Sequence, residues 1–324
     1  MPDQIATANP VTLADIEAAA ARIARRVRHT PLIEAAPLKA PACDGRLLLK
    51  LENLQVTGSF KARGASNTLL SLSAAEIERG IITASGGNHG LAVAYAGWQA
   101  GTRAVIYLSE NAHPAKAAKL RDWGAEVVVE GALWDDSNRL ALDHAAREGL
   151  TYIHPFADPR VIAGQGTAGL EILDQAPETD VLIVAIGGGG LISGVSTAAK
   201  GVKPGIRVIG VEPSGAPTLK RSLEAGAAVP LERVETAAAT LAPRQSEAIN
   251  VEIIGRNVDE IVLVSDSAMR EAARWLWFEL GIAAELSGAA AIAALQGGAV
   301  AVPPGATVTA LVCGAGTDGL APDS

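Results

Sequence analysis

The stretch of sequence that decides the fold is VLIVAIGGGGLISG, residues 181–194. Its first six residues are all apolar, which is typical of a parallel strand that is buried on both faces. Four consecutive glycines, Gly187 to Gly190, follow directly and let the backbone turn tightly. The apolar residues after them predict a helix, so the segment predicts a strand, a turn and a helix in succession.

The same alternation continues along the rest of the chain. Short apolar runs predict strands at 47–51, 80–84, 104–108, 126–130, 181–186, 207–211, 260–264 and 308–312. Alanine-rich stretches predict helices at 12–27, 91–100, 114–123, 136–148, 191–201 and 267–280. Strands that alternate with helices in this way predict an α/β protein with right-handed crossovers.

Composition limits the functions that are open to the chain. Its 324 residues can bury the core of one or two domains. With 27 Lys and Arg against 35 Asp and Glu, the formal net charge is −8, so neither nucleic acid nor a membrane is expected as a partner. The two cysteines, Cys43 and Cys313, lie too far apart in sequence to suggest a disulfide framework or a zinc motif. The first residues contain no secretory signal, so the cytoplasm is the expected location.

Three glycine-rich turns each follow a predicted strand directly. They are SGGNHG at 85–90, GGGG at 187–190 and GAG at 314–316. Ligands of open α/β sheets bind at the carboxyl ends of the strands, so three such turns predict a ligand that is contacted at several places. Backbone amides at a following helix N-terminus suit a carboxylate or a phosphate, although each turn taken alone could be purely structural. The second turn lacks the Gly-Lys-Ser/Thr of a P-loop.

A lysine in the segment TGSFKARG, residues 57–64, is the candidate for covalent chemistry. Lys61 stands between Phe60 and Ala62, just after a Thr-Gly-Ser turn. A partly desolvated lysine loses its proton readily, which a Schiff-base amine requires. A surface lysine at the start of a helix is the alternative, and the local residues alone leave both open.

Taken together, these segments resemble the fold type II pyridoxal-phosphate enzymes, specifically the serine/threonine dehydratase and serine racemase family. The resemblance covers nearly the whole chain and implies two domains of open twisted sheets with flanking helices, like the tryptophan synthase β subunit. It implies a large cofactor-binding domain of residues 1–52 and 150–324, and a small domain of residues 53–149 that closes over the cleft. The matching segments are 29–32, 59–65, 85–90, 154–156, 161–167, 187–190, 210–213 and 313–316.

The resemblance also implies a role for particular residues. Lys61 would hold pyridoxal 5′-phosphate and then take the α-proton of the substrate. The remaining cofactor contacts would be Phe60 along the cofactor, Asn88 at the 3-oxygen, Gly187, Gly188, Gly189 and Gly190 at the phosphate, and Glu285 and Cys313 at the ring edge that carries the nitrogen. The carboxylate of the substrate would be bound by Ser85, Gly86, Asn88 and His89.

Departures from the family pattern narrow the expected reaction. Gly86 stands where racemases of the family carry a serine that delivers a proton, so racemisation is disfavoured. Metal-binding relatives carry an acid six positions after the Glu of the Glu-Pro pair, and here that place holds Thr218, so a divalent cation near Glu212 and Ala216 is doubtful. The turn at 314–316 lacks the usual asparagine, a difference that the sequence does not explain.

The sequence therefore predicts a pyridoxal-phosphate-dependent ammonia-lyase. Its substrate would be an L-β-hydroxy amino acid, foremost L-threonine or L-serine, and its products a 2-oxo acid and ammonia. Other substrates, such as 3-hydroxyaspartate, phenylserine or another β-substituted amino acid, stay open, as do a serine racemase and a binding-only module. A β-replacement enzyme fits less well, because such enzymes carry Asp-Arg where this chain has Ala62-Arg63. Homodimers are usual in the family.

Overall fold

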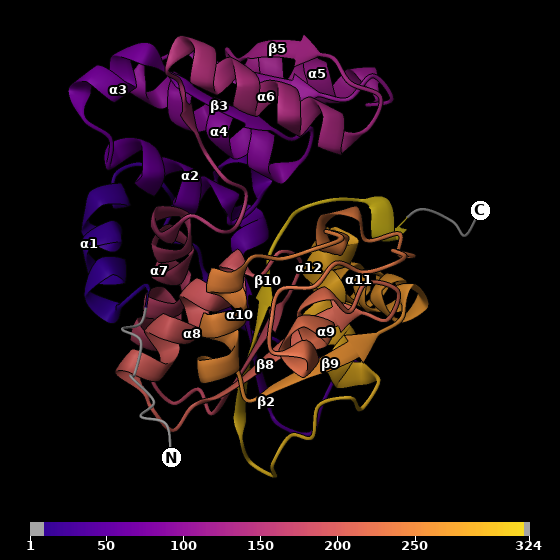
Figure 1. Ribbon diagram of the computed structural model, residues 1–324. Helices are drawn as coiled ribbons and strands as arrows, with labels where there is room; N and C mark the ends of the chain where they lie inside the picture. The colour runs from indigo at the N-terminus through magenta and orange to yellow at the C-terminus, as the bar shows by residue number, and fades with distance from the viewer. Residues whose placement is uncertain (1–9, 321–324) are drawn as a thin grey trace, which may run out of the picture.

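Two sheets organise the computed structural model of the protein, which describes residues 10–320 (Figure 1). The predicted outer limits of the large domain, residues 1 and 324, lie outside this range. The larger sheet has six strands in the order β1-β2-β10-β7-β8-β9, and all neighbours are parallel except β1 and β2. Its strands are β1 Leu32–Glu34, β2 Arg46–Leu51, β7 Val181–Ala185, β8 Arg207–Pro213, β9 Glu260–Val264 and β10 Thr307–Val312.

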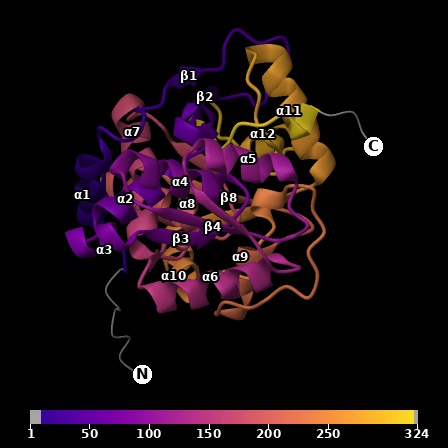
Figure 2. The same ribbon diagram turned by 90° about the horizontal axis from the view of Figure 1, so that it is seen from above.

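The smaller sheet has four parallel strands in the order β5-β4-β3-β6. These strands are β3 Ile81–Ala84, β4 Ala104–Leu108, β5 Glu126–Val129 and β6 Thr151–Tyr152. Figure 1 shows this layer, with α3, α4, α5 and α6, as the upper lobe above the six-stranded layer, and Figure 2 shows the same lobe from above. The strand β6 lies just beyond residue 149, where the sequence predicts that the small domain ends.

Twelve α-helices flank the two sheets in the described part of the chain. None of them is long and apolar enough to span a bilayer. They are α1 Leu13–Ile23, α2 Lys61–Leu70, α3 Ala74–Arg79, α4 Asn88–Ala100, α5 Pro114–Asp122, α6 Trp134–Glu148, α7 Pro159–Gln175, α8 Gly190–Val202, α9 Thr218–Ala225, α10 Ala248–Asn257, α11 Asp266–Leu280 and α12 Leu286–Gln296.

The predicted elements correspond closely to the observed ones, with two kinds of difference. The first helix ends at Ile23 rather than near residue 27, because the amides of Arg26 and Val27 both donate to the Ile23 carbonyl and the Arg26 carbonyl accepts the Tyr95 hydroxyl. The helices α2, α7 and α12 were not predicted. In α7 the glycines obscure the helical pattern, because glycine has a low helix propensity.

Those glycines allow α2, α7 and α8 to pack closely. A Cβ atom on Gly164 of α7 would lie 2.6 Å from the Cα atom of Gly64 in α2. A Cβ atom on Gly194 of α8 would lie 2.5 Å from the backbone nitrogen of Gly166 in α7. The backbones of the three helices are therefore in direct contact, and α2 also packs against α4 of the upper lobe. Helix α2 thus connects the two layers.

A buried network of four charges fixes the position of α2. The fully buried guanidinium of Arg63 forms paired hydrogen bonds of 2.7–2.8 Å with the carboxylates of Glu52 and Glu171. The Lys50 ammonium, also fully buried, contacts Glu171 at 2.6 Å and donates to the Thr30 carbonyl at 2.8 Å. Two cations and two anions balance, so the network carries no net charge. It joins the end of β2, α2 and α7.

Removal of the Arg63 side chain is expected to destabilise the protein strongly. In Arg63→Ala, Glu52 would be left buried without its cation, and breaking a buried pair in this way costs about 3–5 kcal/mol. Urea denaturation should show that loss of unfolding free energy. Arg103→Ala is the matched control, because Arg103 pairs with Glu126 and Glu148 at the surface, where pairs contribute less than about 1 kcal/mol. Equal losses in the two variants would contradict this account.

Candidate active site

Lys61 begins α2 on the side of the six-stranded layer that faces the upper lobe. Its Nζ donates to the Pro155 carbonyl at 2.6 Å and lies 5.1 Å from the centre of the Phe60 ring. Burial lowers the pKa of Lys61 to about 8, although Cys313 and Glu285 nearby act in the opposite direction. The lysine is therefore close to the protonation state that the sequence predicts for an amine that forms a Schiff base.

The segment before Lys61 is fixed by contacts with two distant segments. The Gln55 side chain accepts from the Arg28 amide at 2.8 Å and donates to the Arg28 carbonyl at 2.7 Å. Gly58 has a positive φ of 84°, and its carbonyl accepts from the Ala315 amide at 2.8 Å. The turn at 314–316 therefore lies directly against the approach to Lys61, and Phe60 donates its amide to the Cys313 carbonyl.

Glu285 lies between the first and third glycine-rich turns. Its Oε1 accepts from the Asn88 amide at 2.9 Å and from the Ser287 hydroxyl at 2.5 Å. A Cβ atom on Gly314 would stand only 2.2 Å from the same oxygen. The structure thereby explains a feature that the sequence left open, because the turn after Cys313 must be rich in glycine to make room for Glu285. Burial raises the pKa of Glu285.

Cys313 is a buried thiol at the end of β10. It contacts the Ser287 hydroxyl, with 3.6 Å between sulfur and oxygen, and so joins the chain of groups that leads through Glu285 to Asn88. Burial raises the pKa of Cys313 to about 12, which keeps the thiol neutral at physiological pH. Ser287 is a member of this chain that sequence reasoning missed, because no motif surrounds it.

The four glycines form a closely packed turn at the start of α8. A Cβ atom on Gly188 would lie 2.3 Å from the ring of Phe156, and one on Gly190 would lie 2.5 Å from the Phe156 carbonyl. The Gly188 carbonyl accepts from Asn250 at 3.0 Å and from Ser246 at 2.8 Å. Sequence analysis did not predict a role for Asn250 or Ser246, because they lie in a segment without a recognisable motif.

This turn has the properties of an anion site. Its carbonyl is directed to Asn250 and Ser246, while the amides of Gly188 and Gly189 donate to no other backbone group in the described chain. The turn precedes the thirteen-residue helix α8, whose N-terminal dipole favours negative charge. A phosphate fits these donors. With the lysine, the neutral thiol and the Asn88 amide, the residues present fit pyridoxal phosphate.

The predicted substrate residues lie on the small sheet, where β3 leads into α4. The Ser85 hydroxyl accepts from the Gly87 amide at 3.3 Å. The His89 ring is directed away from a substrate role, since its Nε2 contacts the Ile153 carbonyl at 2.9 Å and burial lowers its pKa to about 3. A neutral His89 has no charge for a carboxylate, so the contribution open to it is its backbone amide at the start of α4.

Gly86 has little room for a side chain. A Cβ atom there would lie 3.0 Å from Leu108 and 3.3 Å from the Lys116 side chain. The serine that racemases of the family place here would therefore need its neighbours to move. Glycine itself carries no group that could exchange a proton.

The candidate metal residue Glu212 is occupied by backbone contacts. Its carboxylate accepts from the amides of Leu219 and Lys220 at 2.7 and 2.9 Å, and so caps α9. Residues 10–320 contain no group of three or more His, Cys, Asp or Glu side chains that could hold a metal ion. The Thr218 hydroxyl donates to the Pro243 carbonyl instead. A divalent cation at Glu212 and Ala216 gains no support from this arrangement.

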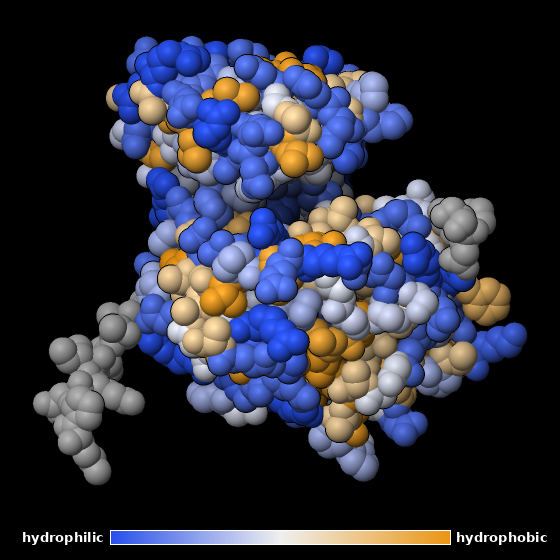
Figure 3. Space-filling view, turned by 45° about the vertical axis from the view of Figure 1, so that its right-hand side comes forward, coloured by the Kyte–Doolittle hydropathy of each residue, from blue (hydrophilic) through white to orange (hydrophobic). Residues whose placement is uncertain are grey.

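The site opens into the groove between the two lobes, which Figure 3 shows as a recess. A cavity of about 350 Å³ is lined there by His154 and Ala157 and by residues 247–249 at the start of α10, next to Asn250. Burial lowers the pKa of His154 to about 4, so this side chain is neutral as well. A second cavity of about 200 Å³, between α1, α2 and α7, does not include any glycine-rich turn.

Comparison with known proteins places this geometry in a family. Residues 23–314 match the family described as pyridoxal-phosphate dependent enzymes, and the chain belongs to that family. It is 40% identical over 285 residues to L-threonine ammonia-lyase of Thermotoga maritima, covering 88% of this chain and 71% of that protein. It is also 40% identical over 314 residues to phenylserine dehydratase of Ralstonia pickettii, covering 95% and 94% of the two chains.

Solved structures agree with the sequence matches. A threonine deaminase from the organism abbreviated T.th. superposes with a TM-score of 0.87 at 38% identity, covering 94% of this chain and 98% of that one. Maize serine racemase superposes with a TM-score of 0.89 at 32% identity, covering 94% of each chain. The predicted fold type II architecture, the predicted cofactor and the prediction of a pyridoxal-phosphate-dependent ammonia-lyase are confirmed.

The close packing of the four glycines gives a prediction about the cofactor. In Gly188→Ala, the new methyl group overlaps the Phe156 ring, and such overpacking costs about 1–3 kcal/mol. We therefore expect the cofactor to dissociate about tenfold or more readily, as measured by equilibrium dialysis. Gly205→Ala is the control, because a Cβ atom there meets no other atom within 4 Å. Unchanged retention in Gly188→Ala would show that the turn does not bind the phosphate.

The lowered pKa of Lys61 gives a prediction about pH. Only the neutral amine can attack the cofactor aldehyde, and at pH 7 a pKa of about 8 leaves about 10% of it neutral, against about 0.03% at the ordinary value of 10.5. The rate at which the cofactor-free protein recaptures pyridoxal phosphate should therefore rise with pH to a plateau, with a midpoint near 8. Absorbance of the lysine-bound cofactor follows the reaction. A midpoint near 10 would contradict the assignment.

Proposed function

We propose that the protein removes water and ammonia from L-β-hydroxy amino acids, foremost L-threonine and L-serine, to give 2-oxo acids. The observation that supports this most is Lys61, a nearly neutral amine beside a glycine turn suited to phosphate and a neutral thiol. The names of the relatives, threonine ammonia-lyase and threonine deaminase, agree with it. The proposal includes the cofactor and substrate roles that the sequence analysis assigned.

The residues would hold the cofactor and substrate as follows. Lys61 would bind pyridoxal phosphate covalently beside Phe60, with the phosphate on the amides of Gly187 to Gly190. Asn88 would donate to the 3-oxygen, held by Glu285, and Cys313 would face the ring nitrogen. When bound, pyridoxal phosphate supplies an electron sink that makes the α-proton of an amino acid acidic. Ser85, Gly86 and the amides of Asn88 and His89 would bind the substrate carboxylate.

The protein groups then determine how protons move. Lys61, freed by the incoming amino group, would accept the α-proton at Nζ, because its lowered pKa leaves a neutral fraction available. The neutral Cys313 thiol does not drive protonation of the ring nitrogen as an aspartate would. A long-lived carbanion is then disfavoured, and early departure of the β-hydroxyl is favoured. The net change converts threonine into 2-oxobutanoate and ammonia.

Two alternatives are weighed against this proposal. Racemisation needs a proton donor on the opposite face of the α-carbon, and Gly86, packed against Leu108 and Lys116, provides none. Phenylserine has specific support, because the Ralstonia pickettii relative that matches 95% of the chain is named for it. We therefore retain an aromatic β-hydroxy amino acid as the second candidate substrate.

Domain division, assembly and location belong to the same proposal. The two sheets support a small domain of about residues 53–149 within a large one. A homodimer is supported by exposed apolar side chains, including Trp98, 60% exposed beside Trp123, with 5.6 Å between the ring centres. Light scattering should give twice the chain mass of 33.0 kDa. The acidic composition is consistent with the proposed location in the cytoplasm.

The proposed reaction is tested by release of a 2-oxo acid from the cofactor-loaded protein. We expect turnover of L-threonine or L-serine, with 2-oxobutanoate or pyruvate and ammonia formed in equal amounts. Lys61→Ala should lose the absorption of the lysine-bound cofactor and should retain less than about one thousandth of the rate, because it lacks the base. Full activity in Lys61→Ala would refute the proposed mechanism.

A further inference from the structure

Two exposed apolar side chains stand at the rim of the cleft without a function so far. Leu133 and Trp134 are 61% and 47% exposed, and they lie where the chain leaves β5 and enters α6. Large apolar side chains at a rim this open are costly to leave in water, and they suit an apolar ligand or partner. Their place in the fold indicates which of these it is.

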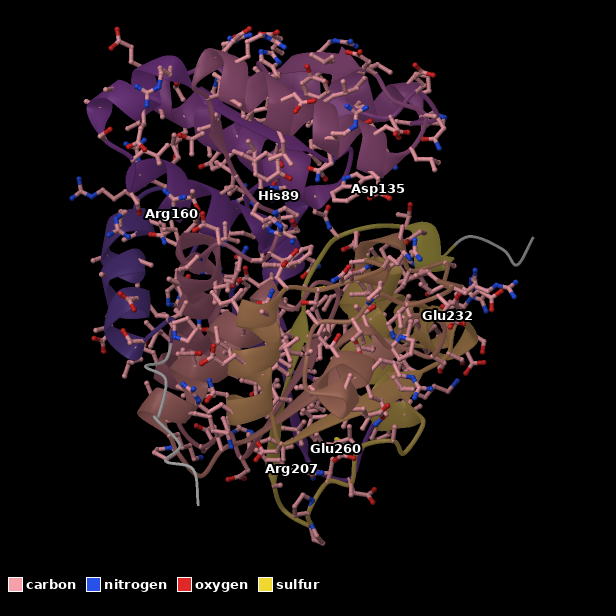
Figure 4. All side chains as sticks on the ribbon, viewed as in Figure 1. His89, Asp135, Arg160, Arg207, Glu232 and Glu260 are labelled. Atoms are coloured by element: carbon pink, nitrogen blue, oxygen red, sulfur yellow. The ribbon has the colours of Figure 1, made fainter. Side chains whose placement is uncertain are left out.

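Trp134 is attached to the turn proposed to bind the substrate. Its indole Nε1 donates to the Ala84 carbonyl at 2.9 Å, and Ala84 is the last residue of β3, directly before Ser85. The strands β3, β4 and β5 are parallel, so their carboxyl ends meet at one edge of the sheet. Figure 4 shows Asp135, the next residue, and His89 on the side of the upper lobe that faces the larger lobe.

The hydrogen bond leaves Trp134 with apolar surface alone to offer. Because the N–H is the only polar group of the indole, its exposed remainder is ring surface, and Leu133 adds an aliphatic neighbour. The next two residues, Asp135 and Asp136, are acidic, and Asp136 accepts from the Leu133 amide at 3.1 Å. This rim therefore favours an apolar group over a second carboxylate.

We propose that Leu133 and Trp134 form the apolar wall that receives the β-substituent of the substrate, and that the enzyme prefers β-hydroxy amino acids with an aromatic β-substituent. The inference rests on the proposed function, because it places the amino-acid carboxylate on the Ser85 turn. A substrate bound there has its β-carbon close to the edge that Trp134 borders. An aromatic ring gains most from this wall, because it can stack on the indole.

The test compares substrates across four forms of the cofactor-loaded enzyme. The substrates are L-threonine, L-serine, L-threo-3-phenylserine and L-threo-3-hydroxyaspartate. The forms are the natural enzyme, Trp134→Ala, Trp134→Phe and the control Trp277→Ala, which removes a 54% exposed tryptophan from α11 in the other lobe. Trp134→Phe keeps an aromatic ring but loses the donor to Ala84.

We expect the natural enzyme to use phenylserine with a kcat/KM at least about tenfold above serine. Trp134→Ala should lower kcat/KM for phenylserine about 10- to 100-fold and for threonine less than about threefold, because only the aromatic substrate loses its contact. Trp134→Phe and Trp277→Ala should stay within about threefold of the natural enzyme. Binding of L-phenylalanine and L-alanine, which cannot lose a β-hydroxyl, gives a readout without turnover, and Trp134→Ala should weaken only the former.

Other outcomes overturn the inference in ways that separate it from the proposed function. Threonine turnover without phenylserine turnover, or a preference for 3-hydroxyaspartate, would leave the function standing and refute the wall. Equal losses on threonine and phenylserine in Trp134→Ala, or a loss in Trp134→Phe as large as in Trp134→Ala, would show that Trp134 only supports the Ala84 turn. If no substrate reacts, the proposed function fails, and the two binding measurements alone decide whether Trp134 receives an aromatic side chain.

Discussion

The buried guanidinium of Arg63 is the constraint on which the rest of the structure depends. It is inaccessible to solvent and forms paired hydrogen bonds with Glu52, at the end of the six-stranded sheet, and with Glu171 in α7. An unpaired charge at that depth is so unfavourable that the three segments are stable only when they meet. Since Lys61 precedes Arg63 by two residues in the same first turn of α2, the network also fixes where the reactive amine stands.

Close backbone approach is the second condition, and glycine provides it throughout. Gly64 with Gly164 and Gly166 with Gly194 let α2, α7 and α8 pack with their backbones in contact, so both the lysine and the phosphate turn are carried on one rigid unit. The four-glycine turn rests on Phe156, and the turn after Cys313 rests on Glu285. The same contacts that stabilise the core therefore also bring together the residues of the site.

Much of this could be predicted from the sequence, because continuous apolar runs and glycine turns are local signals. The eight strand predictions, Lys61, the four glycines and Cys313 all depend on such patterns. Helices α2 and α7 were missed, because their glycines serve distant neighbours that local patterns do not show. The supporting groups Ser287, Asn250 and Ser246 were missed for the same reason, since each becomes meaningful only beside a residue far away in the chain.

The site also shows where a resemblance needs correction by geometry. His89 belongs to a recognisable motif, yet its ring is turned to the Ile153 carbonyl and stays neutral, so the motif alone overstates its part in binding a carboxylate. The glycine at position 316 had no interpretation from sequence, and the structure explains it by the position of Glu285, whose Cβ atom would lie 2.8 Å from a Cβ atom on Gly316. Trp134 carried no motif at all.

The central claim is that one lysine, buried at the start of α2, is the residue that binds the cofactor covalently. The most direct measurement is to reduce the cofactor-loaded protein with borohydride and to locate the pyridoxyl group by mass spectrometry of its peptides. The account predicts the modification at Lys61 and at no other lysine in significant amount. Modification of Lys50 or Lys116 in its place, or no modification in a protein that retains its cofactor, would contradict the account.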